Sequence, residues 1–266
     1  MKIQFKGRYS LFAGILLLLF SATAHAGPLH KLFGFPQADS NEKPMYGFSS
    51  YEDFIKNRTI RQEAADRKLI DEVTKGPGGE PEAFRHLVYR GWQYLSEGDW
   101  KTSMKRFNQT MLLRPHDFNV YWGFAANLGS QKKFDESLAT FEKSKSFYQP
   151  SQLLHDWDYV TFLRDFANSH INKMDGMGDG SDKQAMAAQL IGITEEALGQ
   201  PPSEKNKDIA ADLNLMWAYG LYAQQKFEES WQKVHRTRAL FPKLLEEPER
   251  AAFVKALSQK MPDPGE

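Results

Sequence analysis

The sequence predicts an all-α protein built as a stack of helical hairpins. Apolar residues recur at helical spacing through most of the chain, and no segment shows the alternation of apolar and polar residues that marks a half-buried strand. Bulky aromatic residues also recur at an interval of 34 residues, each between two amphipathic segments. Together these patterns favour paired helices that repeat along the chain.

The first 26 residues have the pattern of a secretory signal peptide. Basic residues occur within the first eight positions, Leu11 to Phe20 is apolar, and small residues end at Ala26. An apolar run of ten residues is shorter than the roughly 20 that cross a bilayer as a helix. We therefore expect cleavage after Ala26 rather than an uncleaved anchor. The mature chain is expected in the bacterial periplasm, with secretion as the alternative, and without an integral membrane span.

The charge and the absence of cysteine exclude several classes of function. Loss of residues 1–26 removes three of the 34 basic residues and none of the 34 acidic ones, so the net charge becomes about −3. Nucleic acid and anionic membrane surfaces are usually bound by a basic excess, which this chain lacks. The absence of cysteine excludes disulfides, thiolate nucleophiles and cysteine-based metal sites.

Two segments precede the repeating region. Residues 27–49 contain three prolines and no periodic apolar pattern, which indicates a flexible leader. Residues 50–79 begin at Ser50 with a capping-box pattern, continue as an amphipathic helix, and end in the Gly-Pro hinge Gly76-Pro77-Gly78-Gly79.

The repeating region is organised around Trp100, Phe134 and Phe227. Each follows a polar turn and opens a second amphipathic segment, and the first two are 34 residues apart. Close packing of two antiparallel helices needs a small residue at the point of approach and large apolar residues beside it. These requirements are met nine places before each aromatic, by Gly91, Ala125 and Ala218, and seven places after it, by Phe107, Phe141 and Val234.

This arrangement resembles the tetratricopeptide repeat (TPR) family. Two tandem repeats would cover residues 84–151 and a further repeat residues 211–244. Residues 152–210 are one repeat plus 25 residues, which we interpret as a degenerate repeat with a Gly-rich insertion at 174–182. Residues 245–266 are expected to form a C-terminal capping helix and tail. The resemblance implies a right-handed α-solenoid.

The sequence departs from the family at two kinds of position. The alanine usual within each repeat is serine here, at Ser103, Ser137 and Ser230, and the usual leading tryptophan is replaced in each copy.

The resemblance also implies a binding surface on the first helix of each repeat. The family's groove positions correspond to Arg85, Val88, Trp92, Asn119, Trp122, Ala126, Asp212, Leu215, Tyr219 and Tyr222. The set is aromatic and mostly uncharged, so it lacks the cations with which some family members clamp a C-terminal carboxylate. Such a groove suits an apolar helix or an extended peptide. Packing of some of these aromatics between the repeats, or against the helix before them, is the alternative.

No residue pattern predicts chemistry. The insertion Asp175 to Asp182 resembles a calcium loop only in part, because Met177 occupies a ligand position and Met186 replaces the required glutamate. It also lacks the lysine of a phosphate-binding loop. The histidines show no i, i+4 pair, and no Gly-x-Ser-x-Gly motif occurs. We therefore predict no cofactor, no metal site and no catalytic residue.

These patterns predict a non-catalytic protein–protein interaction module or scaffold of the bacterial periplasm. Its partner would be another envelope or secreted protein, bound through a peptide or helix in the aromatic groove. A glycan-binding or small-ligand-binding protein is the alternative, because aromatic grooves also stack on sugar rings. A hydrolase with a dispersed site is a third hypothesis, which would require clustered carboxylates in a deep cleft. Self-association is open, since the helix within 50–75 could exchange with a second copy across the hinge.

Overall fold

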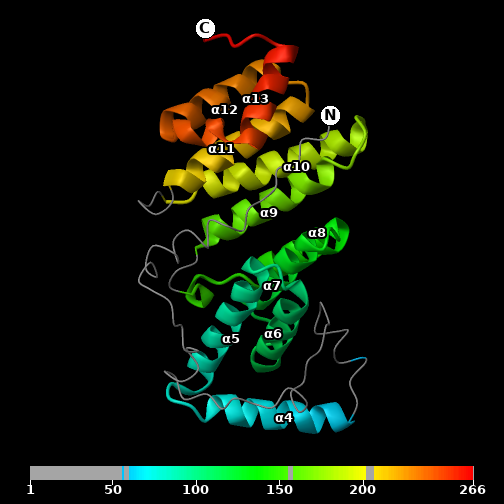
Figure 1. The fold of residues 1–266 in the computed structure, drawn as a ribbon, viewed down its shortest axis with the longest axis vertical. Helices are drawn as coiled ribbons and strands as arrows, with labels where there is room; N and C mark the ends of the chain where they lie inside the picture. The colour runs from blue at the N-terminus through cyan, green and yellow to red at the C-terminus, as the bar shows by residue number, and fades with distance from the viewer. Residues whose placement is uncertain (1–55, 57–59, 155–157, 202–206, 266) are drawn as a thin grey trace. The chain divides into compact units, whose positions relative to one another are not determined.

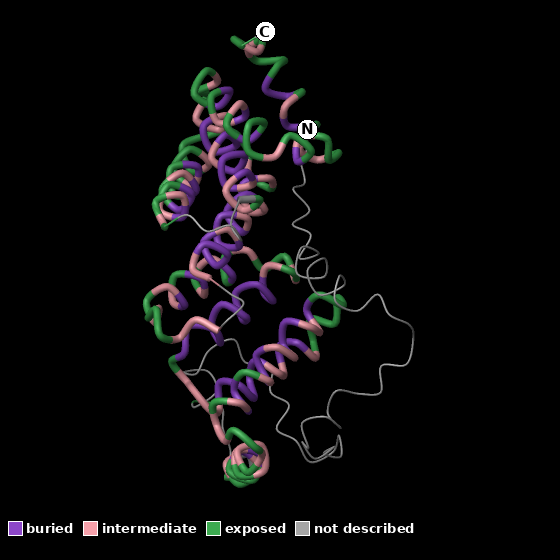
Figure 2. Tube along the Cα trace, turned by 90° about the vertical axis from the view of Figure 1, so that its left-hand side faces the viewer, coloured by how far each residue is buried: buried purple, intermediate pink, exposed green. Residues whose placement is uncertain are grey.

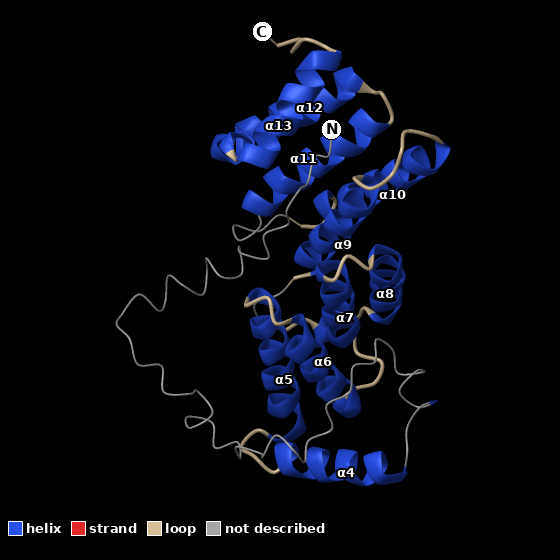
Figure 3. Ribbon diagram, turned by 45° about the vertical axis from the view of Figure 1, so that its right-hand side comes forward, coloured by secondary structure: helices blue, strands red, loops and turns tan. Residues whose placement is uncertain are grey.

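The computed structural model describes residues 56, 60–154, 158–201 and 207–265, so the predicted signal peptide and leader lie outside the described residues. All regular structure in the described residues is helical, with ten α-helices and two 3₁₀ segments (Figure 3). The all-α prediction is confirmed. The chain divides into two compact units: the N-terminal unit ends at Leu154, and the C-terminal unit begins at His155. In the described residues, no helix combines the length and apolar character needed to cross a membrane.

The described part of the N-terminal unit has five α-helices, and consecutive helices pack together (Figure 1). They are α4 (Ile60–Thr74), α5 (Gly79–Ser96), α6 (Trp100–Leu113), α7 (Phe118–Ser130) and α8 (Phe134–Phe147), followed by the 3₁₀ segment η1 (Pro150–Gln152). Helix α4 packs against α5 and α6. The predicted start of this first helix, at Ser50, lies outside the described residues.

Helix α5 begins earlier than the repeat boundary at Phe84 that the spacing predicts. The turn after α4 uses Gly78 and Gly79 at φ 87° and 60°, a conformation that glycine adopts without steric cost. Glu80 and Glu82 then occupy the first turn of α5, where negative charge stabilises the positive end of the helix. Pro81 is tolerated there because the amide groups of a first turn have no partner within the helix.

Residues 158–201 and 207–265 of the C-terminal unit also form five α-helices. They are α9 (Tyr159–Met174), α10 (Ser181–Leu198), α11 (Lys207–Ala223), α12 (Phe227–Leu240) and α13 (Pro248–Lys260), with the 3₁₀ segment η3 (Pro242–Glu246) before the last. Helix α9 is the first described α-helix of the segment 152–210, which the sequence predicts as a degenerate repeat. It begins at Tyr159, where the Asp158 carboxylate caps it by accepting a hydrogen bond from the Thr161 amide at 2.7 Å.

The three hairpins α5–α6, α7–α8 and α11–α12 turn in the same way. In each, the residue two places before the aromatic has a positive φ. The residue directly before the aromatic donates its backbone amide to the carbonyl of the residue six places before the aromatic. The positive φ angles are 81° at Gly98, 62° at Lys132 and 63° at Gln225. The bonds join Asp99 N to Tyr94 O (2.9 Å), Lys133 N to Leu128 O (3.0 Å) and Lys226 N to Leu221 O (2.9 Å). Three dissimilar turn sequences therefore give one geometry.

In two of the three hairpins, a serine that follows the aromatic by three residues joins the two helices. The Ser137 hydroxyl donates to the Ala125 carbonyl at 2.8 Å, and the Ser230 hydroxyl donates to the Ala218 carbonyl at 2.8 Å. Both serines are fully buried. Since these acceptors are the small residues at the point of helix approach, the hydroxyl adds a polar link where the backbones are closest.

Phe107 is the centre of the packing between α5, α6 and α7. It is fully buried, and its ring lies against Gly91 of α5 and Gly123 of α7. A Cβ atom added at these glycines would lie 2.7 Å and 2.2 Å from the Phe107 ring. Buried positions, purple in Figure 2, lie along the helices of each unit and leave green positions exposed. The aromatic side chain thus fills space that the absence of two side chains creates.

The Gly123→Ala substitution tests this contact. We expect it to lower the free energy of unfolding by about 1–3 kcal/mol, because the ring of Phe107 must move in a packed core. Thermal and urea unfolding followed by circular dichroism measure the change.

Gly192→Ala is the matched control, since Gly192 also lies within a helix but nothing lies within 4 Å of an added Cβ. This variant should be more stable by about 0.5–1 kcal/mol, because alanine restricts the unfolded chain and favours the helix. Equal effects of the two substitutions would contradict the proposed role of Phe107.

Candidate functional site

The predicted groove residues of the N-terminal unit lie mainly in its interior. Val88, Trp92, Trp122 and Ala126 are all buried. The Trp92 ring packs edge-on against Trp122, with ring centroids 5.3 Å apart, and against Phe107 at 5.7 Å. The contacts of these side chains are therefore those of a helix-packing core.

Asn119 holds the start of α7. Its side-chain amide donates to the Asp117 carboxylate at 2.9 Å and to the carbonyl of Gln152 at 2.8 Å. The same carboxylate accepts the Asn119 backbone amide at 2.8 Å and so caps α7. Burial raises the pKa of the Asp117 carboxyl, and the hydrogen bonds from Asn119 oppose that shift. Asn119 thus has a structural role in joining α7 to the 3₁₀ segment.

In the C-terminal unit, Leu215 and Tyr219 are buried and Tyr222 is half-buried. The Tyr219 hydroxyl donates to the Asp175 carboxylate. Burial, followed by the nearby Asp175 charge, raises the pKa of Tyr219 far above its usual value, so the phenol stays protonated. The ring of Tyr222 packs against Phe227 and Phe253, with centroid distances of 5.6 Å and 5.7 Å.

Asp212 is also engaged within the C-terminal unit. The Arg250 guanidinium of α13 donates to the Asp212 carboxylate at 2.9 Å, and both side chains are largely covered. Arg250 also pairs with Glu247. This contact fixes the last helix against α11.

Most of the predicted groove residues therefore lie inside the two units, which agrees with the alternative that these side chains pack between helices. Seven of the ten residues are buried, two are half-buried and one, Arg85, is exposed. Helical spacing identifies the face that these residues share, but it carries no information about which neighbouring helix covers that face. The buried residues are Val88, Trp92, Asn119, Trp122, Ala126, Leu215 and Tyr219. Partner binding by the ten residues stays a prediction that no observation tests.

Substitution of Asn119 and of Arg85 distinguishes the two kinds of predicted groove residue. Asn119→Ala should lower the free energy of unfolding by about 1–3 kcal/mol, because it leaves buried polar groups without their partner. Arg85→Ala should change it by less than about 0.5 kcal/mol, since the exposed Arg85 pairs with Glu82 three residues before it on the same helix. Chemical denaturation measures both. A stable Asn119→Ala protein would argue against the structural role.

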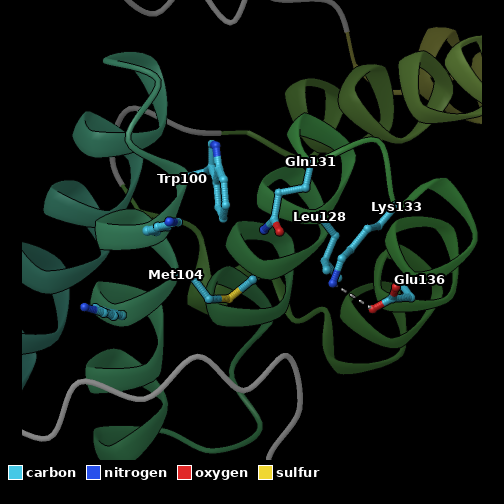
Figure 4. Close-up of a pocket in the computed structure, with 8 residues that line it drawn as sticks. Trp100, Met104, Leu128, Gln131, Lys133 and Glu136 are labelled. Atoms are coloured by element: carbon cyan, nitrogen blue, oxygen red, sulfur yellow. Dashed lines mark ion pairs between the residues drawn. The ribbon is translucent and has the colours of Figure 1, made fainter.

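A surface pocket of about 230 Å³ lies at the start of α6 and beside the α7–α8 turn. Figure 4 shows Trp100 and Met104 on one side and Gln131, Leu128 and Lys133 on the other. Trp100 is 39% exposed, whereas Met104 and Leu128 are buried. The pocket thus has an apolar base and a large aromatic side chain at its edge.

Hydrogen bonds from α7 fix the edge of this pocket. The fully buried Asn127 donates from its side-chain amide to the Trp100 carbonyl at 2.8 Å, and its side-chain oxygen accepts from Gln131 at 2.7 Å. On the other side of Trp100, the Asp99 carboxylate caps α6 by accepting from the Thr102 amide at 3.0 Å. The backbone around the indole is therefore held before any ligand arrives.

The rim of the pocket is basic. Lys101, Lys105 and Lys133 line it together with one acid, Glu136. Lys133 and Glu136 are 3.9 Å apart and both about half exposed, so their pairing is weak. The Lys101 ammonium lies 5.3 Å from the centre of the Trp100 ring. Backbone and side-chain hydrogen bonds from Thr102, aided by the Lys105 charge, lower the pKa of the Asp99 carboxyl beside the rim.

The sequence analysis identified Trp100 as a repeat anchor but not as part of a surface site. A usable signal was present, because the anchor is tryptophan here and phenylalanine in the other two hairpins, and Lys101 and Lys105 follow it at one-residue and five-residue spacing. A basic pair beside an aromatic on the first turns of a helix indicates a surface rather than a core position.

The Gly-rich insertion has a simpler role than a metal loop. Asp175 ends α9 and accepts from Tyr219, and Asp179 pairs with Lys183 at 3.2 Å. Within residues 60–154, 158–201 and 207–265, no three His, Asp or Glu side chains are grouped as a metal site would require.

Comparison of the chain with protein-family models, with curated proteins and with solved structures finds no match.

Proposed function

We propose that the chain is a non-catalytic interaction module of the bacterial periplasm, which binds a peptide or helix of another envelope protein. The observation that carries the proposal is the half-exposed Trp100 at the edge of a pre-formed apolar pocket. Tryptophan is enriched among the residues that dominate binding energy in protein interfaces. The proposed export of the chain to the periplasm rests on the signal-peptide pattern of residues 1–26.

The repeated hairpins support the same proposal. Three hairpins share their turn geometry, and two share the buried serine link, which is the regularity expected of a helical-repeat scaffold. In a TPR-type stack the terminal helices close the apolar ends, and α4 and α13 occupy the positions next to the first and last of these hairpins. Repeats of this kind serve as rigid supports for a binding surface.

The size of the pocket favours a peptide over a glycan or small ligand. Sites for drug-sized ligands usually enclose about 300–1,000 Å³, whereas this pocket has about 230 Å³. That volume suits one or two side chains presented by a longer segment. The binding surface proposed here therefore differs from the aromatic groove of the sequence analysis.

Capture of a partner from envelope extract tests the proposed function. The mature chain should retain a specific protein, and the complex should re-form from the two purified proteins with a Kd below about 10 μM, as a stable interface requires. Trp100→Ala should weaken the reconstituted complex at least about tenfold.

The matched control is Trp217→Ala, because Trp217 is a half-buried tryptophan outside the pocket. It should leave the affinity unchanged. The proposal fails if no protein is retained under any condition that preserves the fold, or if added muropeptides stabilise the chain while proteins do not bind.

A further inference from the structure

We infer that the Trp100 pocket takes an acidic segment of a partner protein that inserts one apolar side chain between Trp100, Met104 and Leu128. This inference rests on the proposed function and adds the chemistry of the partner. It follows from the apolar base, the charges on the rim and the hydrogen bonds that hold the backbone at Trp100.

The base of the pocket selects an apolar side chain. Met104 and Leu128 are 6% and 2% exposed, so the part that they present is a small apolar surface at the bottom. The Trp100 ring forms a wall beside it (Figure 4). An aliphatic side chain bound here removes apolar surface from water on both partners, which favours binding.

The rim selects negative charge next to that side chain. Lys101 and Lys105 stand on α6, and Lys133 stands at the start of α8. Lys101, Lys105 and Lys133 line the pocket with one carboxylate, Glu136, whereas the predicted mature chain has a net charge of about −3. Acidic residues on either side of an apolar anchor would meet these lysines, which raises both the affinity and the rate of association.

The site needs little reorganisation to bind. The Asn127 amide holds the Trp100 carbonyl, Gln131 holds the Asn127 side chain, and Asp99 caps the helix on which Trp100 lies. A binding site whose backbone is already fixed loses less conformational entropy on binding than one whose backbone must become ordered. The pocket is therefore pre-organised for an anchor rather than formed by it.

Synthetic peptides test the inference on the mature chain. The probe is a blocked heptapeptide with leucine at its centre and three glutamates on each side. One comparison peptide replaces leucine with glycine, and another replaces all glutamates with lysine. Isothermal titration calorimetry measures Kd, and the Trp100 indole N–H resonance in a nitrogen-15 spectrum reports whether the pocket is the site.

We expect the acidic leucine peptide to bind at least about tenfold more tightly than the glycine or lysine peptide, and to shift the Trp100 resonance. The double variant Lys101→Glu, Lys105→Glu should lose the acidic peptide and bind the lysine peptide more tightly than wild type does. Its matched control is Arg67→Glu, Lys75→Glu, which makes the same charge change at two exposed residues that do not line the pocket. That control should retain the acidic peptide.

Three results would overturn the inference. Equal loss of binding in the two double variants would mean attraction by net charge alone, and equal binding of the leucine and glycine peptides would remove the anchor. A wild-type dimer that Trp100→Ala makes monomeric would mean that a second copy of the chain occupies the pocket. Circular dichroism confirms that each variant is folded, and Trp100→Phe, which keeps an aromatic wall, should retain most of the affinity.

The inference and the proposed function fail in different ways. If the peptides do not bind, but the chain still captures a protein that Trp100→Ala releases, the pocket stays the binding site and its partner is not acidic. If a captured protein is insensitive to Trp100→Ala and to the charge-reversed variant, the interaction module stands and uses another surface. If no protein is captured, the proposed function fails whatever the peptides do.

Discussion

The close approach of α5, α6 and α7 around Phe107 is the contact on which the N-terminal unit depends. The ring occupies space left by Gly91 and Gly123, and any side chain at those positions would overlap it. This contact sets the distance between α6 and its neighbours, and with it the distance between Met104 on α6 and Leu128 on α7. The width of the pocket beside Trp100 therefore depends on how far the buried Phe107 ring holds α6 from α7.

The sequence predicts the hairpins well because their period reflects a packing requirement within each pair of helices. A small residue, an aromatic and an apolar partner at fixed offsets are enough to place α5–α6, α7–α8 and α11–α12. Two of the three serines that replace the alanine usual in tetratricopeptide repeats, Ser137 and Ser230, have a clear packing role, since each buried hydroxyl donates to the carbonyl of the small residue opposite. Helix ends were less predictable, because capping by Asp158 and the turn at Gly78 depend on local hydrogen bonds and dihedral angles.

The candidate site was harder to predict than the fold. Periodicity places Trp92, Trp122 and Tyr219 on one kind of helix face, but whether that face is open depends on other helices. Phe107 of α6 closes over Trp92, and Phe253 of α13 packs on Tyr219. Trp100 shows the reverse, because its place in the repeat predicts a buried side chain, whereas it is partly exposed at the turn of its hairpin. The exposure of a side chain depends on which helices pack around it, so a local stretch of sequence does not predict it.

The turns of the hairpins carry a consequence for how such a chain can change. Lys132 and Gln225 have a left-handed backbone conformation, which costs residues other than glycine about 1 kcal/mol. Their turns nevertheless match that of Gly98. The packed helices therefore impose the turn, and the residue at the corner does not. Both corners are exposed, so substitutions there can alter surface charge while the interior stays as it is. In this architecture the residues most free to diversify therefore lie at the turns of the hairpins.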